Sequence, residues 1–183
     1  MILYLDAFMK KATAVVELEE GAVLYFRIDN PIIEYQGELD KEGLEDRLLK
    51  EFKMSGLVLK DKEIVFGMDK EWKLHSAIVP VSTSAKDESG IKDTGTVLTK
   101  DEFQDLRNYV IEKIKNLGEQ IVEGNIQAKP YKYKAATGCD YCKYKSICQV
   151  DTQAANEKYN DFSKFTSKES VLEEMKKILE KNR

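Results

Sequence analysis

The chain contains 183 residues, 42% of them hydrophobic and 34% charged, and this composition excludes a disordered tail, a collagen-like repeat and a bare coiled coil. Its net charge of −4 excludes a uniformly basic nucleic-acid coat protein, although it leaves room for a local basic face. No apolar run approaches the roughly 20 residues of a membrane span, and the three cysteines are too few for a secreted disulfide scaffold. We therefore expect a globular cytoplasmic protein without membrane contact.

The N-terminal half is predicted to combine helices with short strands. Apolar residues recur every three or four positions over residues 2–16, which predicts an amphipathic helix. No side chain caps the start of this helix, so we expect the natural chain to continue upstream of Met1. A β-branched and aromatic run predicts a buried strand over residues 22–28, and spaced leucines predict a helix over about residues 40–54, ended by Gly56. Shorter apolar runs predict brief strands at residues 57–59, 64–66 and 77–79.

The C-terminal half is predicted to be more helical. Residues 82–95 are polar, glycine-bearing and aperiodic, which predicts a mobile loop. A capping box formed by Thr99 and Glu102 begins a long amphipathic helix, and a similar box formed by Thr166 and Glu169 begins the last helix. This order of helices and short strands predicts an α+β fold.

Charge is divided unevenly along the chain. Residues 17–51 hold eleven acidic against four basic residues, whereas residues 126–148 hold five lysines against one aspartate. Four of the nine tyrosines lie in the basic stretch, interleaved with Lys132, Lys134, Lys143 and Lys145. Lysines neutralise phosphates and aromatic rings stack on bases, so this pattern suits binding to a strand of nucleic acid. The alternative is a solvated basic loop whose tyrosines pack around the neighbouring cysteines.

The three cysteines, Cys139, Cys142 and Cys148, form a C-x2-C-x5-C pattern. A C-x2-C loop lets two thiolates converge on one metal ion or on neighbouring irons of a cluster. Tetrahedral zinc and a [4Fe–4S] cluster both normally take four protein ligands, so one ligand is unaccounted for. Three interpretations stay open: an iron–sulfur cluster with a fourth cysteine outside this chain, a zinc site completed by the only histidine, His75, and reduced cysteines that pack as small apolar residues.

The sequence shows no complete active site. Acidic pairs abound, but none sits in an Asp…(Asp/Glu)-x-Lys arrangement with flanking strands, a carboxylate cluster of the kind that Mg²⁺-assisted hydrolysis requires. A glycine-rich loop for nucleotide phosphates is also missing. We interpret the acidic pairs as solvated faces of helices.

The order of these segments resembles the C-terminal end of the B subunits of bacterial AddAB-type ATP-dependent helicase–nucleases. The resemblance covers most of the chain. Any one of the matching segments is a weak signal, but their order and spacing are specific. The segments are residues 1–8, residues 21–28 with Asn30-Pro31, residues 52–57, Met68-Asp69, the capped helix after Thr99, and the three cysteines followed by Gln149-Val-Asp151.

The resemblance implies part of a RecB-like PD-(D/E)XK nuclease core. In that family a metal-binding Asp and an Asp-x-Lys lie on central strands, followed by a helix that carries Gln-x-x-x-Tyr. Tyr4 matches the tyrosine of this motif, while the glutamine and the strands would lie upstream of Met1. The family's [4Fe–4S] cluster uses one distant cysteine and three near the C-terminus, and the latter places correspond to Cys139, Cys142 and Cys148. The implied cluster would fasten the C-terminal segment to the nuclease domain.

The resemblance also implies how the chain is divided and what it does. We expect the end of the nuclease core at residues 1–38, an inserted α+β region at 39–98, a long helix with the Cys/Lys/Tyr-rich closure at 99–151, and a C-terminal helix at 152–183. The intact protein would pair with the A-type polypeptide of the helicase–nuclease heterodimer. It would hydrolyse DNA with Mg²⁺ in double-strand break repair and recombination, and the four lysines would contact DNA.

This chain alone would be catalytically incomplete. Its exposed core edge would permit an artefactual homodimer, because a sheet without neighbours leaves unpaired backbone groups. The alternative function is a non-catalytic, zinc-stapled module that binds nucleic acid or protein.

Overall fold

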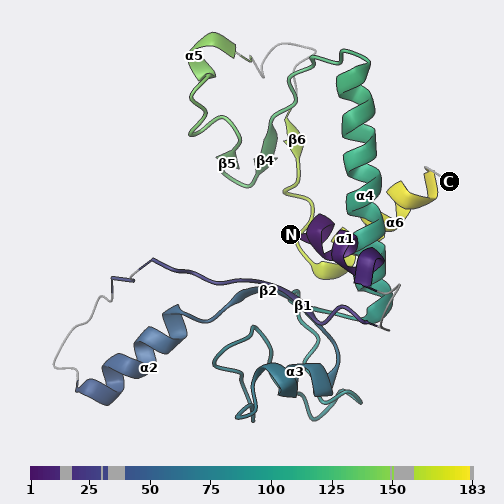
Figure 1. The fold of residues 1–183 in the computed structure, drawn as a ribbon. Coiled ribbons are helices and arrows are strands. Elements are labelled where there is room, and N and C mark those ends of the chain that lie inside the picture. The colour runs from purple at the N-terminus through teal and green to yellow at the C-terminus, as the bar shows by residue number, and fades with distance from the viewer. Residues whose placement is uncertain (13–17, 30, 33–39, 149, 151–158, 182–183) are drawn as a thin grey trace. The chain divides into compact units, whose positions relative to one another are not determined.

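The computed structural model describes the chain except residues 13–17, 30, 33–39, 149, 151–158 and 182–183 (Figure 1). It confirms the mixed α and β structure that the sequence predicts. The chain divides into two compact units, Met1–Val110 and Ile111–Arg183. Each unit has a three-stranded sheet of its own. None of the helices in the described ranges is both long and apolar enough to cross a lipid bilayer.

The sheet of the first unit has the order β1-β2-β3. Strand β1 (Ala22–Tyr25) runs antiparallel to β2 (Ser55–Leu59), and β2 runs parallel to β3 (Val97–Leu98). Successive side chains of a strand point to opposite faces, so alternate residues of these strands supply two separate apolar clusters. The sheet therefore lies between two cores rather than over one.

The two cores join the sheet to different helices. The cluster on one face includes α3 (Lys62–Met68) and the segment after it, and contains Val58, Val65, Trp72, Val79, Val81, Ile91 and Val97. The cluster on the other face includes α4 (Lys100–Val122) and contains Val23, Leu59, Leu98 and Phe103. Helix α1 (Ile2–Ala12) packs against this second cluster through Ile2 and Leu5. Residues 2–12 of the predicted first helix are thus confirmed, and residues 13–16 lie outside the described part of the chain.

The second predicted helix is confirmed as α2 (Lys41–Glu51). The carboxylate of Asp40 caps its start by accepting a hydrogen bond of 2.8 Å from the backbone N–H of Gly43. At its end, the N–H of Phe52 donates to the carbonyl of Leu48. The prediction that Gly56 ends this helix is wrong, because Gly56 lies in β2, opposite Leu24.

Two of the predicted short strands are wrong. Residues 64–66 lie in α3, where the carboxylate of Asp61 accepts hydrogen bonds from the N–H groups of Glu63 and Ile64 at 2.8 and 3.1 Å. Residues 77–79 form no strand, because the N–H groups of Ile78 and Val79 donate to the Oγ atom of Ser76, at 3.1 and 3.0 Å. The strand predicted at residues 57–59 is confirmed within β2, and the one predicted at residues 22–28 is shorter and ends at Tyr25.

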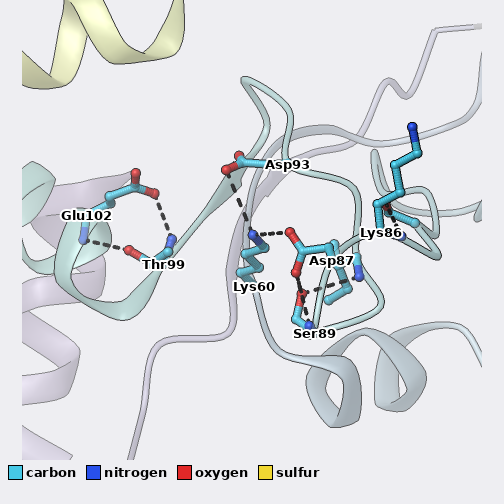
Figure 2. A network of polar contacts seen from close by, with 9 residues as sticks. Lys60, Lys86, Asp87, Ser89, Asp93, Thr99 and Glu102 are labelled. Carbon is cyan, nitrogen blue, oxygen red and sulfur yellow. Dashed lines mark hydrogen bonds and ion pairs between the residues drawn. The ribbon is translucent and has the colours of Figure 1, made fainter.

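The segment 82–95, predicted as a mobile loop, closes on itself. Thr83 and Ile91 form a β-bridge, and the N–H of Ser84 donates to the carbonyl of Gly90 at 2.9 Å. Figure 2 shows how Lys60, the residue after β2, holds the segment: its Nζ atom lies 2.6 Å from Asp87 and 3.8 Å from Asp93. Its mobility stays a prediction, but the segment has fixed anchors and contributes Ile91 to the core.

The anchor formed by Asp87 is expected to depend on pH. The hydrogen bond from Lys60, helped by those from Ser89, lowers the pKa of Asp87 from 3.8 to about 2. Because the folded pKa is the lower one, the stabilisation is complete above about pH 4 and is lost as the pH falls through about 2. We expect Lys60→Met to move the titration midpoint of the Asp87 carboxylate, measured by carbon-13 NMR, back toward 3.8. An unchanged midpoint in this variant would contradict the assignment.

The described residues of the second unit form a small sheet and two helices besides the end of α4. Strand β4 (Tyr131–Tyr133) lies between β5 (Ala136–Thr137), to which it is antiparallel, and β6 (Asn160–Asp161), to which it is parallel. The helices are α5 (Lys145–Cys148) and α6 (Lys168–Lys181). Figure 1 shows the three strands side by side in this sheet.

The first predicted capping box is confirmed at the start of α4. The N–H of Thr99 donates to Glu102 at 2.8 Å, and the N–H of Glu102 donates to the Thr99 hydroxyl at 3.3 Å (Figure 2). The second box is wrong by one residue. At the start of α6 the reciprocal hydrogen bonds join Ser167 and Ser170, both at 3.3 Å.

Candidate functional site

Helix α1, which carries Tyr4, has one buried and one exposed face. Ile2 and Leu5 pack into the core, whereas Tyr4 is 79% exposed and Phe8 is 62% exposed. Phe8 belongs to the apolar repeat that predicts this helix, but it lies on the exposed face instead of in the core. Tyr4, the residue matched to the nuclease helix motif, lies on the exposed face. Large apolar and aromatic side chains gathered on an exposed helix face are typical of a surface that binds something else.

A buried ion cluster fixes the other side of α1. Arg107 of α4 contacts two buried carboxylates, with Nη2 3.0 Å from Asp6 and Nη1 3.2 Å from Glu20. Lys10 lies 2.8 Å from the second oxygen of Asp6. The hydrogen bond from Lys10 outweighs the effect of burial and, with Arg107, lowers the pKa of Asp6. Burial opposes the charge of Arg107, but Asp6 and Glu20 outweigh it and raise the pKa of the guanidinium group.

No sequence pattern predicts this cluster. Its only local signal is Asp6, an acidic residue inside the apolar stripe of the first helix. Arg107 follows it by 101 positions, and no periodicity connects the two. The cluster matters for the candidate site because it holds α1 only two residues away from Tyr4.

The three cysteines lie in the turns after β5 and in α5, all in the second unit. Cys139 is half-buried, Cys142 and Cys148 are exposed, and all three are free thiols. The N–H of Cys142 donates to the carbonyl of Cys139 at 3.4 Å, and the N–H of Cys148 donates to the carbonyl of Tyr144 at 2.8 Å. Within the described ranges, no three His, Cys, Asp or Glu side chains are gathered so that they could hold a metal ion.

In donor chemistry, the three thiols fit an iron–sulfur cluster. They lie within ten residues of sequence, none forms a disulfide, and none is fully buried. Thiolates are the usual ligands of such clusters, and three thiols provide all but one of the four that a [4Fe–4S] cluster takes. The alternative ligand, His75, lies in the first unit, where its Nδ1 atom is 2.8 Å from the hydroxyl of Ser82.

Lysines and tyrosines surround the cysteines. We call the set Tyr131, Lys132, Tyr133, Lys134, Tyr141, Lys143, Tyr144 and Lys145 the lysine–tyrosine surface. All of its members are exposed except Lys132, which is half-buried. Tyr141 is 99% exposed and Tyr144 70%, so these two rings do not pack around the cysteines. Both rings are open to solvent.

The backbone shapes one end of this surface. Lys134 adopts a left-handed conformation, with φ of 54°, at the turn between β4 and β5. Its N–H donates to the hydroxyl of Ser163 at 2.7 Å, and its ammonium group lies 5.4 Å from the centre of the Tyr133 ring. A cation and an aromatic ring thus lie side by side at this end of the surface.

Comparison with known proteins identifies the family. The profile of the PD-(D/E)XK nuclease superfamily matches residues 1–149, which is most of the chain. The chain belongs to the PD-(D/E)XK nuclease superfamily. The matched range includes helix α1, both sheets except β6, and the three cysteines.

Relatives named as the B subunit of an ATP-dependent helicase/deoxyribonuclease confirm the resemblance in the sequence. The protein from Clostridium botulinum (strain Loch Maree / Type A3) is 37% identical over 98% of this chain. Those from Thermoanaerobacter sp. (strain X514) and Clostridioides difficile (strain 630) are 36% and 37% identical over 100% and 96% of it. The chain spans only 15–16% of the length of these three relatives.

Proposed function

We propose that this chain is part of the B subunit of a helicase–deoxyribonuclease and completes its nuclease domain. The observation that carries the proposal is the PD-(D/E)XK match over residues 1–149, together with 36–37% identity to the named relatives over nearly the whole chain. The whole protein would work in the cytoplasm with the A-type polypeptide of the heterodimer. It would hydrolyse DNA phosphodiesters during double-strand break repair and recombination.

The Mg²⁺-binding carboxylates would come from outside these 183 residues. The sequence contains no Asp…(Asp/Glu)-x-Lys arrangement with flanking strands, so this chain alone would not cleave DNA. Helix α1 would contribute Tyr4 to the active site. Its exposed face, with Leu3 46%, Tyr4 79% and Phe8 62% exposed, gives the rest of the nuclease core an apolar surface to pack on.

Cys139, Cys142 and Cys148 would hold a [4Fe–4S] cluster together with a fourth ligand from outside the chain. When bound, the cluster would supply a covalent link between distant parts of the whole protein. The lysine–tyrosine surface surrounds these cysteines, so fastening this segment would also place the surface against DNA. A zinc-stapled module has less support, because its fourth ligand, His75, already forms a hydrogen bond with Ser82.

The proposed function is tested by comparing the 183-residue chain with a longer protein that includes the residues encoded before it. We expect the longer protein to cleave linear double-stranded DNA in Mg²⁺ and to contain about four iron atoms, and the shorter chain to do neither.

Tyr4→Phe in the longer protein should lower kcat, whereas Tyr25→Phe, at an exposed tyrosine outside α1, should not. Cleavage by the short chain that a point substitution within it abolishes would overturn the proposal. Stoichiometric zinc lost on His75→Ala would favour the zinc module instead.

The four lysines of the lysine–tyrosine surface are expected to bind phosphates. On duplex DNA, each phosphate contact steepens the fall of log affinity with log salt by about 0.9. Changing Lys132, Lys134, Lys143 and Lys145 to Gln should therefore reduce the magnitude of this slope by up to about 3.6. Fluorescence anisotropy of labelled DNA at several salt concentrations measures it. The matched control changes four other exposed lysines of the same unit, Lys113, Lys164, Lys177 and Lys181. If the salt dependence of DNA affinity falls equally in both variants, only the net charge of the unit, and not the position of these lysines, determines DNA binding.

A further inference from the structure

The first unit contains a cavity that the proposed function does not use. It has a volume of about 880 Å³, within the range of roughly 300–1,000 Å³ that is usual for small-molecule sites. One wall is a face of α3, and the opposite walls are the residues after α3 and the start of segment 82–95. The lining residues that matter here are Lys62, Phe66, Gly67, Trp72, Lys73 and Ser84.

The walls of this cavity are held in place by contacts outside it. Asp61 caps the start of α3, and Val65 in the middle of that helix is completely buried. The opposite wall is closed by the Thr83–Ile91 bridge and by the ion pair of Lys60 with Asp87. A cavity with walls anchored in this way is preformed, which lowers the entropic cost of binding a ligand.

The polar groups of the cavity favour an anionic ligand. Lys62 and Lys73 are exposed and form no ion pair with any residue in the described part of the chain. Against these two cations the lining contains one acidic residue, Glu63. The hydroxyl of Ser84 accepts a hydrogen bond from the N–H of Lys86 at 3.3 Å, so its own hydrogen can be donated to a ligand oxygen.

The aromatic residues favour a ligand that also has a flat ring. Phe66 lines the cavity and is 54% exposed, which leaves its ring accessible for stacking. Trp72 forms the inner wall and is 8% exposed, and its indole N–H is a buried donor without a hydrogen-bond partner in the described residues. Gly67 adds space beside them, since a Cβ atom built there would meet no atom within 4 Å.

We propose that this cavity binds one nucleotide of a single-stranded DNA segment, with its phosphate at Lys62 and Lys73 and its base against Phe66. An acidic peptide would satisfy the lysines but would leave the exposed ring of Phe66 unused, so the combination favours a nucleotide. The inference rests on the proposed function, because it assumes that DNA is the substrate. It gives the first unit a DNA contact of its own, separate from the lysine–tyrosine surface of the second unit.

The only tryptophan of the chain reports on this cavity directly. We expect thymidine monophosphate and a short 5′-phosphorylated oligothymidylate to change the fluorescence of Trp72 saturably, with one site per chain. Thymidine alone and inorganic phosphate should bind at least about tenfold more weakly, because each supplies only one of the two kinds of contact. Oligoglutamate that competes as well as the oligonucleotide would identify an acidic peptide as the ligand and overturn the proposal.

Two variants test the cavity in different ways. The double variant Lys62→Gln and Lys73→Gln removes the charges, and its matched control is Lys41→Gln with Lys50→Gln on α2. Gly67→Leu fills space at the cavity wall without changing any charge. We expect the lysine pair and Gly67→Leu each to weaken thymidine monophosphate binding about tenfold or more, and the control to leave it unchanged. Circular dichroism would verify that each variant folds.

The outcomes separate this inference from the proposed function. If the chain binds DNA through the lysine–tyrosine surface but neither variant alters the Trp72 response, the cavity inference is wrong and the proposed function stands. If the longer protein shows no Mg²⁺-dependent cleavage, the proposed function fails, whatever Trp72 reports. A Trp72 response that disappears when Lys132, Lys134, Lys143 and Lys145 are changed would place the binding site on the second unit and overturn the inference.

Discussion

Replacing Arg107 with methionine is expected to destabilise the first unit by about 3–5 kcal/mol, because the substitution leaves two buried carboxylates without their cation. Asp6 and Glu20 are only 5% and 7% exposed, and Arg107 contacts both, at 3.0 and 3.2 Å. Lys10 still neutralises one oxygen of Asp6, so the larger cost falls on Glu20. The free energy of unfolding, measured with urea, checks this expectation.

Two further variants separate the ion cluster from general effects of charge. Arg47→Met removes the same group from an exposed position on α2 and should change stability by less than about 0.5 kcal/mol. Combining Arg107→Met with Asp6→Asn and Glu20→Gln should recover part of the loss, because no buried charge is then left unpaired. A loss of less than about 1 kcal/mol for Arg107→Met alone would contradict the expected role.

The same cluster gives a pH dependence of known sign. The pKa of Asp6 is lowered below 3.8 by Lys10 and Arg107, so its ion pairs stabilise the fold fully above that pH. The difference in stability between the original chain and Asp6→Asn should therefore shrink as the pH falls below about 4. The opposite trend would mean that burial, rather than the cations, dominates the titration of Asp6.

Replacing Gly56 with alanine is expected to destabilise the first unit by at least about 3 kcal/mol, because both the conformation and the space exclude a side chain. Gly56 has a φ of +141°, which side chains rarely permit. A Cβ atom there would lie 2.1 Å from the carbonyl oxygen of Val23 and 3.0 Å from the Cα atom of Leu24. Since both belong to β1, the strand pair has to separate to make room.

The matched control is the same substitution at Gly67. A Cβ atom there would meet nothing within 4 Å, and alanine favours the helix by about 0.5–1 kcal/mol, so Gly67→Ala should be neutral or stabilising. Both variants lie in the first unit, so thermal unfolding of that unit compares them directly. Equal and small effects at the two positions would show that β1 and β2 separate without cost.

Local sequence signals predicted the helices best. The helix that begins after Asp40 and the one that begins after Thr99 have side-chain caps that act within three residues, and both are present. The prediction of a strand at residues 64–66 is wrong because a run of three apolar residues has no distinguishable period. The cap by Asp61 next to this run favours a helix instead. The prediction that Gly56 ends the second helix is wrong because a glycine marks a special backbone position but does not show which neighbouring segment requires it. Here the requirement comes from the close approach of β1.

The candidate sites also differ in whether local sequence patterns reveal them. The spacing of Cys139, Cys142 and Cys148 and the alternation of lysine with tyrosine are local patterns, so the sequence alone could single out these residues. The cavity beside Trp72 and the contact of Arg107 with Asp6 join residues that are far apart in the chain. Local sequence patterns therefore do not predict this cavity or this ion cluster.

The sequence by itself determined the family, through the order and spacing of segments along the chain, and the mixed α and β composition and the cap of α4, through residue types within a few positions of one another. Only the tertiary structure decided that the sheet lies between two cores, that Arg107 neutralises Asp6 and Glu20, and that Lys62 and Lys73 line one cavity with Trp72. The physical reason is that burial and long-range pairing depend on the packing of distant segments, which local propensity does not specify.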